Sequence, residues 1–472
     1  MRWNKTISIL CLLGVLMPSF VHAGNRDLDR ISKDVFSRID FGISKASLSN
    51  KESLKELLSK PLTVDSTVQI ALLNNQFLQA TLESWGIAKA DFNKTRLPEK
   101  PVFEASYRVP DHEIDDNVEF AIEQDFLSFV LFPLKSNLAG AQLHKAELQI
   151  TNEVLDLAFE VKTAFYEVQG DMAMLSMRKR VLEQAEASAE LARRQFEAGN
   201  ISELGLANEK SLYQDAKLEY LKAEADFILK KENLNRLIGF GGGNLSWEIK
   251  EELQEIQVSE LSYDELLSMG MSKRLDLLIA RKNVEALKHA LSLNRFGVLG
   301  HPEVGVSTEK DVEGGRVTGP TLRTEVPIYD LGQTEVSRSG AELKEAEFRL
   351  KAIENDVRSE IKQKRNHLFA MRTLVDEYRN AVIPVREKVT EETQKHYNFM
   401  LLGNYDLIRA KQSEILAYKE YVDSLKDYWI TRSDLEKAIS SKLPVTKTMD
   451  KNTQKEKPMA TTSYAHHGGV HE

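Results

Sequence analysis

Three histidines stand close to the end of the sequence, at His466, His467 and His471. Neutral imidazole nitrogens bind zinc, copper and nickel. The surrounding segment 442–472 is polar, and its composition is typical of a disordered chain. The three side chains are therefore candidate ligands of a weak metal-collecting site. The alternative is an incidental soluble tail.

Charged residues of both signs gather around two glycine–asparagine pairs, Gly199-Asn200 and Gly403-Asn404. Rings of charge set the ion preference of a narrow passage, and opposite charges could hold such a passage shut. For each residue taken singly, the alternative is the charged, solvated face of an ordinary helix. The candidate constriction charges are Arg193, Arg194, Glu203, Glu391, Glu392, Asp406 and Arg409.

Catalytic patterns do not stand out in this sequence. We find no nucleophile–base pair, phosphate-binding glycine loop or further metal-ligand spacing above chance. The formal net charge of -9 argues against nucleic-acid binding, because that binding depends on neutralising phosphates. We therefore expect neither an enzyme nor a nucleic-acid-binding protein, and no cofactor.

The N-terminus has the pattern of a secretory signal peptide. Arg2 and Lys5 precede an apolar run over 7–17, and Val21-His22-Ala23 resembles a cleavage site. Residues 1–23 are therefore expected to direct export. The only cysteine, Cys11, lies inside this segment, so the mature chain needs no disulfide.

The chain has an internal duplication, in which the second half repeats the first at an offset of about 200 positions. The segment Gly140-Ala141-Gln142-Leu143, for example, returns as Gly340-Ala341-Glu342-Leu343. Such a duplication predicts two copies of one structural unit. The predicted divisions are a signal peptide at 1–23, an N-terminal periplasmic segment at 24–60, repeat 1 at 61–240, a linker at 241–260, repeat 2 at 261–441 and a tail at 442–472.

Each copy predicts a long antiparallel helical hairpin. Apolar residues recur every seven positions from Val154 to Phe196, which is typical of a coiled-coil seam. The second copy repeats the seam from Ile361 to Val389, where Pro384 should bend or loosen the helix. An ordinary soluble coiled coil is the alternative for this pattern.

The hairpins are expected to turn at the two glycine–asparagine pairs. Glycine ends helices in the left-handed conformation, and Ser202 and Asp406 are placed to cap the returning helices. The predicted tips lie near 199–202 and 400–406.

Between the helices of each copy the apolar period changes to two. Phe103 and Tyr107 alternate with Glu104 and Arg108, and a polar loop and a second alternating run follow. This pattern predicts β-hairpins at about 101–132 and 302–329. Four strands are too few to close a barrel, so one chain would leave open edges. A periplasmic sandwich built from the same strands is the alternative.

One stretch of the second copy carries a family resemblance, which extends to nearly the whole mature chain. The stretch Gly319-Pro320-Thr321-Leu322-Arg323-Thr324-Glu325-Val326-Pro327-Ile328-Tyr329-Asp330-Leu331-Gly332-Gln333 resembles the strand-to-helix signature of TolC-like outer-membrane efflux factors. It is most similar to the cation-efflux outer-membrane subunits that work with resistance-nodulation-division (RND) pumps. The first copy departs from the pattern, with Leu131-Phe132-Pro133 where an aspartate–glycine turn is expected.

This resemblance implies a mainly α fold with a β-barrel part. Three chains would each donate four strands to a twelve-stranded barrel in the outer membrane of a Gram-negative bacterium, and the helices would form a tunnel across the periplasm. Phe103, Tyr107, Phe126 and Tyr329 would face lipid or its interface, and Glu104 or Arg108 would face the lumen.

The same resemblance implies a homotrimer working with a periplasmic adaptor, or membrane fusion protein, and an inner-membrane RND pump. The chain would be a passive conduit, with metal cations as its expected cargo. Drug efflux and type I polypeptide secretion remain alternatives, as does a soluble periplasmic adaptor or structural protein. The expected adaptor contacts are Gly199, Asn200, Ile201, Gly403, Asn404 and Tyr405.

Overall fold

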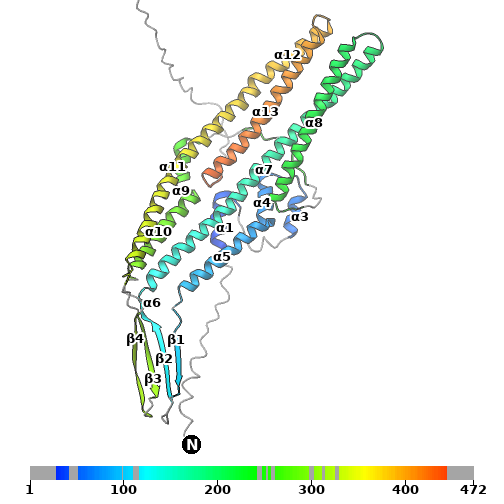
Figure 1. The fold of residues 1–472 in the computed structure, drawn as a ribbon. Helices are drawn as coiled ribbons and strands as arrows, with labels where there is room; N and C mark the ends of the chain where they lie inside the picture. The colour runs from blue at the N-terminus through cyan, green and yellow to red at the C-terminus, as the bar shows by residue number, and fades with distance from the viewer. Residues whose placement is uncertain are drawn as a thin grey trace, which may run out of the picture.

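The computed structural model describes residues 28–41, 51–97, 99–109, 116–241, 247–250, 253–256, 261–296, 302–310, 314–324 and 329–443. The expected signal peptide at 1–23 and the three histidines of the tail lie outside these residues. The molecule is elongated, with a small sheet at one end and two helical hairpins at the other (Figure 1).

The chain runs twice through helices, a β-hairpin and a helical hairpin, as the duplication predicts. The first passage comprises α1 (Leu28–Ile39), α3 (Lys51–Leu58), α4 (Val64–Asn74), α5 (Gln76–Thr95), β1 (Val102–Arg108), β2 (Asn117–Asp125), α6 (Phe126–Val130), α7 (Phe132–Glu197) and α8 (Glu203–Leu237). The second comprises α9 (Tyr263–Lys273), α10 (Leu275–Phe296), β3 (Glu303–Lys310), β4 (Arg316–Arg323), α11 (Gln333–Glu377), the π-helix η2 (Tyr378–Val382), α12 (Ile383–Asn398) and α13 (Asn404–Ala438).

The longest helix, α7, has 66 residues and so extends for about 100 Å. Its counterpart is interrupted, because η2 separates α11 from α12 and Pro384 stands in the first turn of α12. Proline has no backbone N–H and cannot donate to the carbonyl one turn earlier, so the helix widens before it. The expected loosening at Pro384 is therefore a π-helical turn. Among the described helices, none is both long enough and apolar enough to cross a lipid bilayer.

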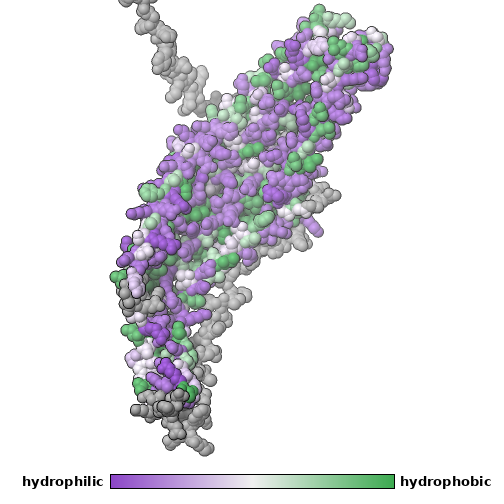
Figure 2. All heavy atoms as spheres, viewed as in Figure 1, coloured by the Kyte–Doolittle hydropathy of each residue, from purple (hydrophilic) through white to green (hydrophobic). Residues whose placement is uncertain are grey.

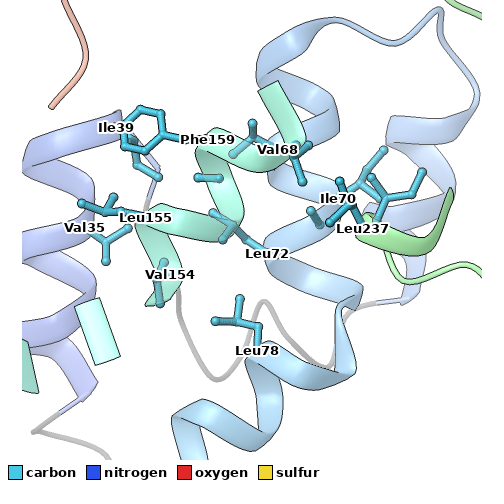
Figure 3. Close-up of a cluster of buried hydrophobic side chains, with 14 of the residues drawn as sticks. Val35, Ile39, Val68, Ile70, Leu72, Leu78, Val154, Leu155, Phe159 and Leu237 are labelled. Atoms are coloured by element: carbon cyan, nitrogen blue, oxygen red, sulfur yellow. The ribbon is translucent and has the colours of Figure 1, made fainter. Parts of the chain in front are cut away.

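The helices form a wall four helices wide. Near the sheet the order is α5, α7, α10 and α11, and towards the tips it is α8, α7, α13 and α12 (Figure 1). The core lies in the middle of the molecule, where Val154 and Leu155 of α7 pack against α1 and α4 (Figure 3). Towards the tip the same heptad seam loses its cover, and Phe196 is exposed.

The two copies meet where α7 crosses α13. Gly170 allows this approach, since a Cβ there would lie 2.5 Å from the Lys426 side chain. One turn away, Tyr166 stacks on Trp429. A buried ion pair joins Lys162 to Glu436 at 2.7 Å. A buried pair of this kind costs desolvation energy, and it fixes the register of the two helices because neither charge can be left alone.

The four strands form a single antiparallel sheet in the order β1-β2-β3-β4. β2 of the first copy pairs with β3 of the second, so the two copies also contact each other in the sheet. Within the described part of the chain, the outer edges of β1 and β4 have no partner strand.

Candidate functional site

The register of the sheet separates apolar and polar side chains onto opposite faces. Directly paired residues share a face, so Phe103 lies beside Ile122, which lies beside Val306. Most of this face is open to solvent in a single chain, and Phe103 is 64% exposed. The apolar side chains of this face are Phe103, Ala105, Tyr107, Val118, Phe120, Ile122, Val304, Val306, Pro320 and Leu322. The same face, which we call the apolar face, also carries Gln124, Thr308, Lys310, Arg316 and Thr318.

The opposite face carries carboxylates, with fewer arginines among them. Its polar residues are Glu104, Ser106, Arg108, Asn117, Glu119, Glu123, Asp125, Glu303, Ser307, Glu309, Thr321 and Arg323. The alternation therefore places Glu104 and Arg108 opposite to Phe103 and Tyr107, as the period of two requires.

This polar face is concave. Arg323 of β4 lies 3.2 Å from Glu104 of β1, although β2 and β3 stand between them. In a flat sheet the two outer strands would be about 14 Å apart, since neighbouring strands are about 4.8 Å apart. Two side chains reach each other over that span most readily if the sheet curls. The acidic face therefore lines the inside of the curve, and the apolar face lies outside.

Aromatic side chains gather where the sheet meets the helices. Phe126 begins α6, and Phe129 and Phe132 follow it within two helical turns. Tyr329, just before α11, is 99% exposed. Exposed aromatic residues at this level are typical of the girdle that meets a membrane interface.

The first helical tip closes as the sequence predicts. Gly199 has a φ of 72°, and the N–H of Asn200 donates to the carbonyl of Gln195. This is the Schellman arrangement that ends many helices. The Ser202 side chain accepts a hydrogen bond from the Gly205 N–H and so caps α8, and Ile201, just before Ser202, is half-buried.

The second tip departs from the prediction. Met400, rather than Gly403, has the left-handed conformation, with a φ of 59°, and the Leu401 N–H donates to the His396 carbonyl. Gly403 has a φ of -81° and is the N-cap of α13. The prediction that Asp406 caps this helix is wrong, because Asp406 lies inside the first turn. Gly403 thus has the place that Ser202, the N-cap of α8, has in the first tip, and Met400 has the left-handed place of Gly199.

The second tip is also apolar, whereas the first is polar. Phe399, Met400 and Leu401 are exposed one after another, and Met400 is 94% exposed. Figure 2 shows hydrophobic surface at the outer end of the hairpin of α12 and α13. A methionine in the left-handed region costs about 1–2 kcal/mol that a glycine would avoid. Strain of this kind concentrates at functional sites. The second tip is thus the better candidate for contact with a partner.

A hydrogen bond joins the two tips within one chain. The Asn208 side chain of α8 donates to the hydroxyl of Tyr405 in α13. The sequence predicts Tyr405 at a contact site, but it gives no such prediction for Asn208. Its only signal is its position, one and a half turns after Ser202, since a lone asparagine on a helix carries no periodic pattern. Asn404 is the first residue of α13.

The predicted constriction charges pair within their own helices. Arg193 and Arg194 both bind Glu190, and Glu391 and Glu392 both bind Lys395. Hydrogen bonds from Arg193 and Arg194 lower the pKa of Glu190 to about 2, so this group stays charged at ordinary pH. Of the remaining candidates, Glu203, Asp406 and Arg409 are exposed. Among the described residues, no ion pair joins one tip to the other, so a role of these charges in a constriction stays a prediction.

A metal centre is not formed within the described ranges. There, no group of three or more histidine, cysteine, aspartate or glutamate side chains is placed to hold a metal ion. The expected ligands His466, His467 and His471 lie outside those ranges, so the metal-collecting tail also stays a prediction.

The fold and part of the sequence match known proteins. Residues 132–240, which cover α7 and α8, match the family model described as outer membrane efflux protein. Over these two helices the chain is similar to outer membrane efflux proteins. This match supports the resemblance that the sequence carries. A comparison with curated protein sequences gives no significant match.

Solved structures of outer-membrane channels share the fold of this chain. A membrane protein from Pseudomonas aeruginosa is 17% identical, with a TM-score of 0.67 over 86% of this chain and 95% of its own. The Campylobacter jejuni CmeC outer membrane channel is 15% identical, with a TM-score of 0.67 over 83% and 88%. CusC, described as forming a transmembrane channel, is 14% identical, with a TM-score of 0.66 over 80% and 91%. At these identities the likeness concerns the fold.

The strain at Met400 gives a testable prediction. Met400→Gly should raise the free energy of opening the second tip by roughly 0.5–1 kcal/mol, since the strain relieved exceeds the added freedom of the unfolded chain. Native-state hydrogen exchange of the tip amides measures this energy. Gly199→Ala is the matched control and should lower protection at the first tip, where open space leaves backbone strain as the only cost. Faster exchange in Met400→Gly would contradict the assignment.

Proposed function

We propose that this chain forms a homotrimeric channel that carries solutes passively from the periplasm to the exterior in a tripartite efflux system. The observation that carries the proposal is the curled sheet, with an exposed apolar face outside and an acidic face inside. Lipid outside and water inside would satisfy both faces at once. The helical wall continues directly from the sheet, so the two parts would form one tube (Figure 1).

The free edges support ring formation. β1 and β4 each expose a row of backbone N–H and C=O groups, and a second copy can pair β1 with the β4 of its neighbour. Contacts between two different edges are head-to-tail, and they close into a ring when the rotation permits. Three copies, the number implied by the family resemblance, would give twelve strands without a free edge.

The helical wall has two matching edges. On one side, α5 and α8 expose large apolar side chains, including Phe77 and Leu229. On the other side, α11 and α12 do the same, with Phe348 and Val385. Exposed apolar side chains of this kind are typical of a subunit interface, because a monomer rarely leaves extended apolar stripes in water. The same head-to-tail contact would thus close the sheet and the wall together.

Partner contact is proposed at the tips, where the wall ends. A periplasmic adaptor linked to an inner-membrane RND pump would meet Gly199, Asn200, Ile201, Gly403, Asn404 and Tyr405. The apolar turn of Phe399, Met400 and Leu401 supports the second tip as the main contact. This tip also ends the helix that η2 interrupts, and a π-helical turn is a place where a helix can bend.

Metal cations are the proposed cargo. The acidic concave face supports this cargo, because carboxylates lining a water-filled passage attract cations and repel anions. Export of drugs or of polypeptides by a channel of the same fold is the second candidate. A soluble periplasmic adaptor or structural protein is a weaker one, since it would leave the apolar face of the sheet in water.

The channel proposal predicts where the protein is found. Membrane fractionation should recover it from the outer membrane as a trimer, and the purified trimer should conduct ions across a planar lipid bilayer. Recovery as a monomer in the soluble periplasmic extract would contradict the proposal and would favour an adaptor.

The cargo proposal predicts a selective sensitivity. A strain lacking the gene should become sensitive to divalent metal salts and not to hydrophobic drugs, and the full chain should restore tolerance. A chain truncated after Lys447 lacks the three tail histidines, and we expect it to restore less metal tolerance than the full chain. Sensitivity to drugs alone would replace metal cations with drugs as the cargo.

The tip proposal predicts that the same added charge affects metal tolerance more at the second tip than at the first. Met400→Asp should abolish metal tolerance, because a carboxylate cannot be buried in an apolar contact without a large desolvation cost. Trimer yield and bilayer conductance should stay normal. Asn200→Asp, the matched change at the first tip, should have the smaller effect. Equal tolerance in both variants and the wild type would remove the second tip as the docking site.

A further inference from the structure

One arginine gathers carboxylates from the whole sheet. Arg323 on β4 lies 3.2 Å from Glu104 on β1, 2.8 Å from Glu123 on β2 and 3.9 Å from Glu303 on β3. We call these four residues the belt. The belt lies at the end of the sheet nearest the helices, since β1 and β3 begin there and β2 and β4 end there. The other arginine on the polar face, Arg108, lies at the far end of β1.

A glycine makes this arrangement possible. Gly305 stands on β3 between Glu123 of β2 and Thr321 of β4, and a Cβ at this position would lie 2.2 Å from the Ile122 carbonyl oxygen and 2.8 Å from Glu123 Cγ. The Glu123 side chain therefore extends across the space that a side chain of β3 would fill. Glu123 is almost fully buried, whereas Arg323 remains 57% exposed on the concave side.

The belt has fewer positive than negative charges. One guanidinium faces three carboxylates, so the belt stays acidic, but less acidic than the carboxylates alone would make it. Conduction requires that an ion enter readily and also leave. A moderately negative ring meets both requirements better than a strongly negative one.

We propose that Arg323 sets the cation preference of the channel by partly neutralising the belt at the entrance from the helical tunnel into the barrel. This inference rests on the proposed channel function, in which every subunit contributes one belt to the same ring. Arg323 acts on the permeating ion through charge, and Glu104 and Glu303 are its accessible partners. The ligand class is a hydrated cation in transit.

The test uses the purified full-length trimer in a planar bilayer with a potassium chloride gradient. Arg323→Gln should shift the reversal potential towards the potassium equilibrium potential, and zinc chloride should block the potassium current at lower concentrations than in the wild type. Glu303→Gln should shift the reversal potential in the opposite direction. Arg323→Lys keeps the charge and should behave like the wild type.

Arg316→Gln is the matched control, because it removes an arginine from the opposite face of the same strand. Its reversal potential should equal that of the wild type. The shift of Arg323→Gln should shrink between 0.1 M and 1 M salt, as the Debye length falls from about 10 Å to about 3 Å.

The outcomes separate the two proposals. A wild-type trimer that conducts, together with unchanged reversal potentials in both Arg323→Gln and Glu303→Gln, overturns the role of the belt and leaves the channel standing. A wild-type trimer without any conductance overturns the channel and the belt together. Should Arg323→Gln fail to assemble, Glu303→Gln and Arg323→Lys still decide the question.

Discussion

The structure depends on one constraint: a four-stranded sheet cannot satisfy the hydrogen-bonding groups along its own two edges. In water those groups bind solvent, but in lipid each unsatisfied group costs several kcal/mol. A chain of this design is therefore incomplete alone, within the part that the structure describes. The edge helices of the wall likewise leave apolar side chains exposed. In the proposed channel, one neighbouring copy would cover both the sheet edge and these side chains.

In the proposed channel, curvature of the sheet would let neighbouring copies close into a tube. The contact from Arg323 to Glu104 spans all four strands, and Gly305 leaves room for the Glu123 side chain to extend across the third. Charged side chains on the concave side thus hold the curve and line it at once. The same ion pairs that shape the wall also set the charge that a passing solute would meet.

The two copies have diverged where they would have to behave differently. Around the crossing of α7 and α13 they are locked together by the close approach at Gly170 and by the buried pair of Lys162 and Glu436. Beyond this crossing the second hairpin has a π-helical turn and a strained, apolar tip, while the first has an uninterrupted helix and a relaxed, polar one. The copies therefore share one architecture, and the second hairpin differs by its helix interruption and its strained turn.

The sequence by itself determined the local structure. Its period of seven predicted the long helices, its period of two predicted the strands and their two faces, and Pro384 predicted the break, because each depends on neighbours along the chain. Only the tertiary structure decided contacts between distant residues. The pairing of Asn208 with Tyr405, the reach of Arg323 across the sheet and the left-handed turn at Met400 instead of Gly403 depend on how separate elements are placed, and periodicity does not record that placement.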